Sequence, residues 1–125
     1  VEYQTVINMP TTDFQKIIRD MTGISDRIEI KSVGNDLIFY CEGNFASSRI
    51  YRSESGGNME FVNKPDATTV VQGEFSLKSL SHFIKCTPLC SNLEIYIGND
   101  LPFIVKYDVA SLGAIKLCLA SLPSS

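Results

Sequence analysis

The sequence is poor in the features that mark several specialised classes of protein. Its 125 residues include only four cysteines and one histidine. Four scattered cysteines are too few for a secreted disulfide scaffold, so a reducing compartment is favoured. No apolar run approaches the roughly 18 residues that span a bilayer, and no signal peptide opens the chain, so we expect no membrane partner.

Motifs for catalysis are also missing. The chain has a single histidine and no nucleophile motif of the type G-x-S-x-G. The stretch SESGGN (53–58) is followed by neither the Lys-Ser/Thr pair nor the helix of a phosphate-binding loop. We therefore expect a protein that is not an enzyme, with no catalytic residue and no cofactor.

One possible metal site needs separate treatment. His82, Cys86 and Cys90 follow one another at intervals of four residues. Pro88 breaks the helix between the two cysteines, and no second ligand pair with zinc spacing follows. Small buried thiols explain the cysteines better, so we expect no metal.

The composition is that of one globular domain. A chain of 125 residues can bury a core, and 44% hydrophobic with 20% charged residues is ordinary for such a domain. The net charge of −3 argues against general nucleic-acid binding but not against a local basic patch. The chain opens in a strand-like pattern without an initiator methionine, so we expect residues 1–125 to be a single domain from a longer protein.

Most of the sequence has the period-two alternation of β-strands. DRIEIKSV (26–33) alternates charged or polar with apolar residues, and GND (34–36) turns the chain into the next strand. The pattern predicts about nine strands, at 3–9, 26–33, 37–43, 47–53, 59–62, 68–75, 92–98, 103–109 and 114–120.

Two segments have the apolar spacing of helices instead. The helix predicted at 11–21 carries one apolar stripe, formed by Phe14, Ile17, Ile18 and Met21. Thr11 or Thr12 is expected as its N-cap, and Gly23 is expected to end it. The helix predicted at 76–86 carries a second stripe, formed by Leu77, Leu80, Phe83 and Ile84. Ser76 is expected as its cap and Pro88 as its stop.

The order of these elements predicts the fold class. Strand, helix and several strands are followed by strand, helix and several strands again. A shift of 66 residues lays Phe14 on Leu80 and Arg19 on Lys85, which is a weak internal duplication. We predict an α+β domain with pseudo-twofold symmetry, in which two helices pack on curved antiparallel sheets.

The polar faces of the two helices are basic. At 100° per residue, five side chains point away from the apolar stripes: Lys16, Arg19, Lys78, His82 and Lys85. Such residues are typical of sequence-independent phosphate contact, although a merely solvated helix face is also possible. Asp13 and Asp20 flank the first helix, and we expect them to balance Lys16 and Arg19 through i+3 and i+4 contacts. Four permanent cations would give a salt slope of at most about −4, so one copy would bind DNA weakly.

Three segments resemble the C-terminal domain of proliferating cell nuclear antigen, the sliding DNA clamp of eukaryotes and archaea. They are VINMPTTDFQKIIRDM (6–21), SLKSLSHFIKCTPLCSNLEIYI (76–97) and LPFIVKYDVASLGAIKLCLA (101–120). The resemblance implies the DNA-clamp fold, in which two-domain protomers close into a ring, commonly a trimer, with the helices lining the channel. Residues 1–125 would then be the C-terminal half of a protomer. Lys16, Arg19, Lys78 and Lys85 match channel positions that meet the DNA backbone, and His82 lies on the same face.

The resemblance also implies two protein-binding regions. The first is the pocket for short motifs of partner proteins, which would include Pro102, Cys118, Leu119, Ala120 and Ser121. Cys118 and Ser121 depart from the family, where an aromatic residue and a proline are usual. The second region is the strand that pairs with the next protomer, formed by Ser48, Arg49, Ile50, Tyr51 and Arg52. Its arginines would discourage wrong pairing of a bare edge.

The function implied is that of a polymerase processivity factor in DNA replication and repair. Its partners would be double-stranded DNA, DNA polymerase and other proteins with clamp-binding peptides, a clamp loader and further protomers. Its location would be the nucleus, or an intracellular replication site if the source is viral or archaeal. The alternative is a clamp-like interaction domain that binds proteins without encircling DNA. For the isolated chain we predict a monomer or a weak oligomer.

Overall fold

The computed structural model describes residues 3–56, 59–64, 68–85, 92–99, 101–109 and 113–122. Within these residues it has two helices and nine strands, each ending within two residues of the predicted position. In chain order they are β1 (Thr5–Pro10), α1 (Thr11–Thr22), β2 (Arg27–Val33), β3 (Asp36–Glu42), β4 (Ser47–Ser53), β5 (Glu60–Asn63), β6 (Val70–Ser76), α2 (Leu77–Lys85), β7 (Asn92–Ile97), β8 (Phe103–Val109) and β9 (Gly113–Leu119). A short 3₁₀ turn, Glu54–Gly56, follows β4.

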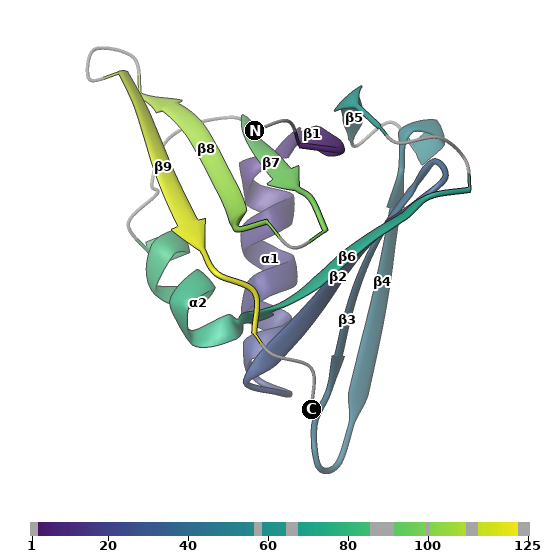
Figure 1. Cartoon of the computed structure of the whole chain (residues 1–125). Coiled ribbons are helices and arrows are strands. Elements are labelled where there is room, and N and C mark those ends of the chain that lie inside the picture. Colours follow the sequence, from purple (N-terminus) through teal and green to yellow (C-terminus); the bar gives the residue numbers. More distant parts are fainter. Residues whose placement is uncertain are drawn as a thin grey trace.

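The strands form two antiparallel sheets, as the α+β prediction requires. One sheet has the order β5-β1-β7-β8-β9, and the other has the order β4-β3-β2-β6. Figure 1 shows β8 and β9 to the left of α1, and β3 and β4 to its right. Neither described helix is long and apolar enough to cross a membrane.

The internal duplication extends from the helices to the strands. Adding 66 to the bounds of β1 gives 71–76, against Val70–Ser76 for β6. The same shift places the start of α1 on the start of α2, and it places β4 on 113–119, the bounds of β9. Each sheet therefore contains three consecutive strands of one half together with the first strand of the other half, which ties the two halves into one domain.

A single core joins both sheets and both helices. The four apolar residues of the stripe on α1 are all buried, at 0–1% exposure. The Phe14 and Phe39 rings, 6.4 Å apart, link α1 to β3. The Phe75 and Phe103 rings, 4.7 Å apart, link β6 of one sheet to β8 of the other. Aromatic pairs at such distances add to the area they bury, so these contacts hold the layers in register.

The start of α1 differs from its prediction. Pro10, with φ −61° and ψ 134°, occupies the N-cap position, and no side chain caps the helix there. Thr11 is buried inside the first turn, and Thr12 is exposed. The prediction of a threonine cap was wrong because proline, the last residue of β1, has an extended φ and ψ that let the helix begin immediately after it. Gly23 does follow the end of the helix, as predicted.

Helix α2 begins as predicted. The backbone N–H of Ser79 donates to Ser76 Oγ at 3.2 Å, which is the contact of a serine N-cap. Leu77 and Leu80 are fully buried, whereas Phe83 and Ile84 are half-buried against the core. Phe83 also meets the Tyr107 ring of β8 at 5.6 Å. Pro88, the predicted stop, lies outside the described residues.

The outer edge of β6 is covered where the two sheets meet. The Asn99 side chain accepts a hydrogen bond from the Gln72 N–H and donates one to the Val70 carbonyl, both at 3.0 Å. The Leu122 N–H donates to the Glu74 carbonyl at 2.7 Å. These bonds satisfy backbone groups that an edge strand would otherwise present to another chain.

Candidate nucleic-acid interface

The five predicted contact residues all lie on exposed positions of the two helices. Their side chains belong to Lys16, Arg19, Lys78, His82 and Lys85. Each helix turns its apolar stripe toward the core, so the basic residues point away from the core. The structure thus brings together on adjacent helices all the residues that the sequence selected for this face.

The two helices are in direct contact. The Gln15 amide of α1 donates to the Ile84 carbonyl of α2 at 3.4 Å. Gln15 lies in the second turn of α1, and Ile84 lies at the end of α2, which is the arrangement expected of antiparallel helices related by a twofold axis. The basic side chains of both helices can therefore contribute to one surface.

Asp13 does not balance the basic residues of its own helix. Its carboxylate accepts two hydrogen bonds from the Arg52 guanidinium of β4, at 2.7 and 2.8 Å. Hydrogen bonding from Arg52 lowers the pKa of Asp13, while Lys16 makes only a smaller electrostatic contribution. The predicted local pairing of Asp13 was wrong because a planar guanidinium can bind both carboxylate oxygens at once, which a lysine ammonium cannot.

The remaining helix charges are left for solvent or for a ligand. Among the described residues, no ion pair joins an acid to Lys16, Arg19, Lys78, His82 or Lys85. Asp20 is exposed at the end of α1 and likewise forms no ion pair within the described part of the chain. The predicted balancing of charge by Asp20 is therefore not seen.

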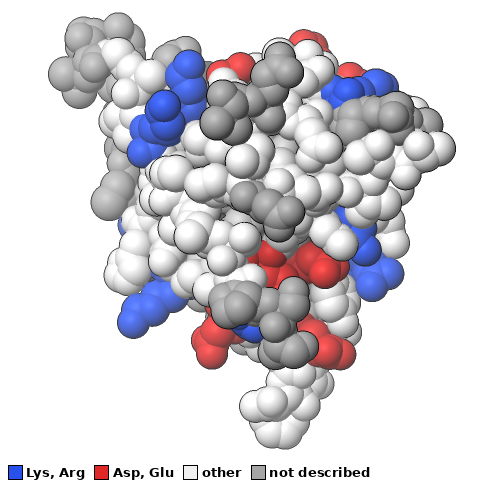
Figure 2. All heavy atoms as spheres, in the orientation of Figure 1, with Lys and Arg blue, Asp and Glu red and all other residues white. Residues whose placement is uncertain are grey.

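The outer face of the second sheet has a different charge pattern. Glu29 of β2 is the register partner of Glu74 of β6. Arg27 lies 3.8 Å from Glu74, and Lys31 lies 4.0 Å from Glu29, so both signs are mixed along these strands. Figure 2 shows acidic side chains at the lower centre of this view, with basic ones standing to its left and right. Such a mixed face does not favour phosphate.

The predicted partner pocket is located at the end of the first sheet. Four of its residues are exposed and Leu119 is half-buried against the core; the exposed ones are Pro102, Cys118, Ala120 and Ser121. Leu119 and Cys118 of β9 pair with Phe103 and Ile104 of β8. Because Pro102 directly precedes Phe103, the β8–β9 pairing brings the predicted residues together at one place.

Tyr3 also lies at this predicted pocket, although the sequence did not indicate it. Its hydroxyl donates to the Pro102 carbonyl at 2.8 Å. Its ring meets the Tyr96 ring edge-on at 5.8 Å. Burial raises the pKa of Tyr3, and the Cys118 side chain raises it further. Tyr3 precedes Cys118 by more than a hundred residues, so no local sequence signal could have linked the two.

The predicted interface strand β4 is an edge strand. It pairs only with β3 in the described sheet, which leaves its other side open. Ser48, Ile50 and Arg52 are half-buried on the core side, while Arg49 and Tyr51 are exposed. Arg52 is bound by the Asp13 carboxylate of α1 at 2.7 Å.

Arg49 and Tyr51 form the exposed face of this edge strand. The Arg49 guanidinium lies 4.8 Å from the centre of the Tyr40 ring on β3. Tyr51 exposes 54% of its surface. Arg49 is thus held over a neighbouring strand and keeps its charge at the surface.

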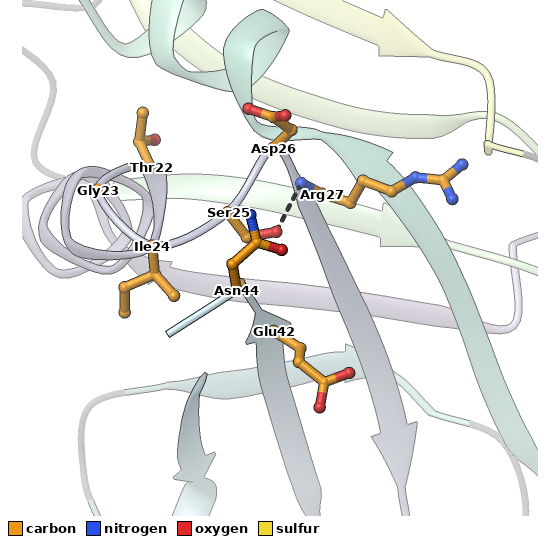
Figure 3. Close-up of a pocket in the computed structure, with 9 residues that line it drawn as sticks. Thr22, Gly23, Ile24, Ser25, Asp26, Arg27, Glu42 and Asn44 are labelled. Atoms are coloured by element: carbon orange, nitrogen blue, oxygen red, sulfur yellow. Dashed lines mark hydrogen bonds between the residues drawn. The ribbon is translucent and has the colours of Figure 1, made fainter. Parts of the chain in front are cut away.

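A surface groove lies between the end of α1 and the β3–β4 hairpin. It encloses about 490 Å³ and is lined by residues 22–27 and 42–44. Figure 3 shows Asp26 and Glu42 at its rim, with the Arg27 side chain directed away from the other residues. None of the basic helix residues lines this groove, so it is separate from the candidate nucleic-acid interface.

Gly43 explains why the hairpin can approach α1 at this groove. A Cβ atom at Gly43 would lie 2.1 Å from the Ile24 carbonyl oxygen. The Gly43 N–H also donates to the Ala46 carbonyl at 2.8 Å, which closes the hairpin. Sequence reasoning missed the groove because its two linings lie about twenty residues apart in the chain.

The question of a metal site concerns His82, Cys86 and Cys90. His82 is exposed, and the two cysteines lie outside the described residues. Within the part of the chain that the structure describes, no group of three acidic, histidine or cysteine side chains could hold a metal ion. Cys41 is buried in the core, as expected of a small apolar group, whereas Cys118 is exposed.

Comparison with known proteins identifies the family. Residues 1–122 match the family described as proliferating cell nuclear antigen, C-terminal domain. The chain is 35% identical over 128 aligned positions to a probable DNA polymerase sliding clamp 1 of Paramecium bursaria Chlorella virus 1, covering 99% of this chain and 48% of that protein. It is 31% identical over 121 positions to a probable DNA polymerase sliding clamp of Acanthamoeba polyphaga mimivirus, covering 97% and 25%.

The chain thus spans about half the length of one relative and a quarter of the other. The match runs through both helices and all nine described strands, including the segments in which the sequence itself showed the resemblance. The chain belongs to the family of C-terminal domains of proliferating cell nuclear antigen.

Proposed function

We propose that this domain is part of a ring-shaped sliding DNA clamp that serves as a processivity factor for a polymerase. The ring encircles duplex DNA, and its helices contact the phosphate backbone without reading sequence. It also tethers replication and repair proteins, is opened by a clamp loader and performs no catalysis itself. In this proposal residues 1–125 form the C-terminal half of a protomer, and three protomers close the ring.

The observation that carries this proposal is the charge on the two helices. Five exposed side chains that are or can become cationic lie on adjacent helices, and none is paired with an acid among the described residues. The Asp13 carboxylate at the start of α1 is already paired with Arg52. Lysine and arginine that are free to meet phosphates supply sequence-independent affinity, as a sliding contact requires.

Two further regions support assembly and tethering. The open edge of β4 offers backbone groups and the Tyr51 side chain to a strand of the next protomer. The predicted pocket around Pro102 and Leu119 offers a partly apolar site to partner peptides. The replication site would be the nucleus or, because both relatives are viral, another intracellular site of viral DNA synthesis.

Retention on circular DNA tests the encirclement. The full-length protein containing this domain is loaded onto nicked circular duplex, and bound protein is measured at raised salt before and after linearisation. We expect retention on the circle and loss from linear DNA, because closure and not affinity holds the ring. Equal loss from both forms would contradict the proposal.

Substitution of the helix cations tests the contact itself. The double variant Lys78→Ala with Lys85→Ala should make the salt slope of direct DNA binding less steep by about 1.8, or about 0.9 for each phosphate contact removed. Lys31→Ala, on the mixed outer face of β2, is the matched control and should leave the slope unchanged. If the helix variant is silent while variants at Pro102 or Leu119 abolish partner binding, the domain is an interaction module that does not embrace DNA.

A further inference from the structure

Two lysines lie directly opposite each other on the outward face of β8 and β9. The inward residues of β8 are all buried, and they are Phe103, Val105 and Tyr107. Lys106 alternates with them and therefore points outward. Its register partner on β9 is Lys116, which is exposed. Directly opposite residues of antiparallel strands have Cβ atoms about 4.5–5.5 Å apart, so the two ammonium groups share one small area of the surface.

This pair of like charges lacks a compensating acid in the described structure. Like charges directly opposite each other destabilise a sheet. Among the described residues no ion pair joins either lysine to an acid. Glu94 of β7 is the other register partner of Lys106, but its carboxylate accepts a hydrogen bond from the Tyr96 hydroxyl at 3.1 Å. Such a departure from the usual rules of stability is typical of residues that serve binding.

An apolar and aromatic row lies next to the two lysines on the same face. Ile104 and Cys118 are register partners and stand two residues along β8 and β9 from the lysines, about 7 Å away. Tyr96 of β7 is the other partner of Ile104. The Tyr3 ring meets the Tyr96 ring at 5.8 Å, and the Tyr3 hydroxyl donates to the Pro102 carbonyl. The lysine pair thus adjoins the predicted partner pocket.

The lysine pair is separate from the basic surface of the helices. Phe83 of α2 packs on Tyr107, an inward residue of β8, with the ring centroids 5.6 Å apart. The helices therefore cover the inner face of this sheet, and the lysines lie on its opposite face. Because Glu94 lies beside the lysines and the neighbouring row is apolar, this face favours a peptide over a run of phosphates.

We propose that Lys106 and Lys116 extend the partner pocket into a docking surface for peptides that carry an acidic residue beside their apolar anchor. This inference rests on the proposed function and specifies the chemistry of the partner at that same site. The peptide carboxylate bridges the two ammonium groups and removes their repulsion, while the apolar anchor packs on the row of Ile104 and Cys118. In an extended peptide the acid then stands about two residues from the anchor.

The expected effect is a preference among peptides, because exposed charge pairs are individually weak. Each lysine should strengthen the binding of an acidic peptide about threefold, and the two together about tenfold. The preference should shrink at raised salt, which screens exposed charges. The apolar anchor supplies the remaining affinity and should be insensitive to either lysine.

The test uses the full-length protein that contains this domain and a matched pair of fluorescent synthetic peptides. Both peptides carry the same aromatic anchor and differ only in having glutamate or glutamine about two residues to either side of it. Fluorescence anisotropy measures binding at low and at raised salt. The wild-type protein should prefer the glutamate peptide about tenfold at low salt. Lys106→Gln and Lys116→Gln should each reduce that preference about threefold, and the double variant should abolish it.

The matched control is Lys31→Gln, which removes a lysine from the outer face of the other sheet and should leave the preference unchanged. An equal loss in Lys31→Gln would mean that overall charge sets the preference, and the inference would be wrong. If a DNA duplex displaces the glutamate peptide from the wild-type protein as well as a free glutamate peptide does, the lysines form a phosphate site instead.

The two peptides also separate this inference from the proposed function. If neither peptide binds, the partner pocket is wrong and the acidic docking surface falls with it. If both peptides bind equally, the pocket stands and the role of the lysines is wrong. A preference for glutamate that is lost only in Lys106→Gln and Lys116→Gln, with unchanged affinity for the glutamine peptide, supports both the pocket and its acidic partner.

Discussion

Strands β4 and β9 occupy equivalent edges of the two halves. The two strands differ, however, in the residues that could bind each strand to the helix of its own half. The end of β4 is bound to the start of α1 by the Arg52–Asp13 ion pair. The hairpin before β4 meets the segment that follows α1, where Gly43 lies against the Ile24 carbonyl. In the second half the counterparts of Arg52 and Asp13 are Cys118 and Ser79, a pair that cannot form an ion pair.

This difference indicates which edge is prepared for a separate partner. A strand held at both ends loses little conformational freedom when another chain pairs with it. The entropic cost of ordering the strand therefore reduces the binding affinity less. In the proposed ring, the open edge of β4 meets a strand of another protomer. An edge that recruits a separate molecule benefits more from being ordered in advance, because no covalent link keeps its partner nearby.

The largest loss of stability is expected from a substitution at Gly43, where the β3–β4 hairpin contacts the segment after α1. Gly43→Ala would place a Cβ 2.1 Å from a backbone oxygen, so the hairpin or the end of α1 must shift. We expect the free energy of unfolding to fall by about 2–3 kcal/mol, as for other overpacked sites. Chemical denaturation measures this, with Gly23→Ala as control, because a Cβ there meets only Asp20 O at 3.6 Å. Equal stability of both variants would show that the hairpin is loosely attached.

The periodic features of the fold could be read from the sequence because they depend on neighbours along the chain. The apolar stripe of α1 and the alternation of β2 come from residues whose spacing matches the helix or the strand. The repeat was clearer in the helices than in the strands, because Phe14 and Leu80 must both fill the core. The basic residues of the candidate interface followed from the same helical geometry.

The contacts that fasten β4 could not be read in this way. Asp13 has a basic residue three positions away, so a local pair was the natural expectation. The structure supplies Arg52, 39 residues distant, with better geometry for a carboxylate. Gly43 and Ile24 likewise meet only because the hairpin folds back over α1. Such contacts depend on the tertiary fold, which local spacing does not specify.

The second prediction concerns the ion pair. A double-mutant cycle with Asp13→Asn and Arg52→Ala should give a coupling energy of about 1 kcal/mol, since the pair is bidentate and its side chains are only 20% and 27% exposed. The cycle is measured by thermal or chemical unfolding at neutral pH. The pair of Lys31 and Glu29, at 4.0 Å and more exposed, is the control and should couple by nearly zero. A coupling near zero for both pairs would remove the contrast between the two edges.

Acid should weaken the same fastening. Hydrogen bonding from Arg52 lowers the pKa of Asp13 from its usual 3.8, so the folded state favours the charged carboxylate. The resulting stabilisation is complete well above that value and is lost as pH falls through the lowered pKa of the folded state. Below about pH 4 the wild-type chain should therefore lose stability faster than Asp13→Asn, which has no carboxyl to protonate. Parallel stability curves for the two proteins would exclude this contribution from Asp13.

The smallest effect is expected from transferring the ion pair to the other half. Ser79→Asp combined with Cys118→Arg places an acid in the first turn of α2 and a guanidinium on β9, at the counterpart positions. Asp in a first helical turn is favourable by a few tenths of a kcal/mol, and an exposed pair adds a similar amount, so we expect a gain of about 0.5 kcal/mol. The single variants separate the two contributions in urea denaturation. If the double variant gains more stability than the sum of the two single variants, the new side chains interact, and the two halves share their geometry closely enough for the ion pair to be transferred. If the gains simply add, β9 lies too far from α2 for the ion pair to form.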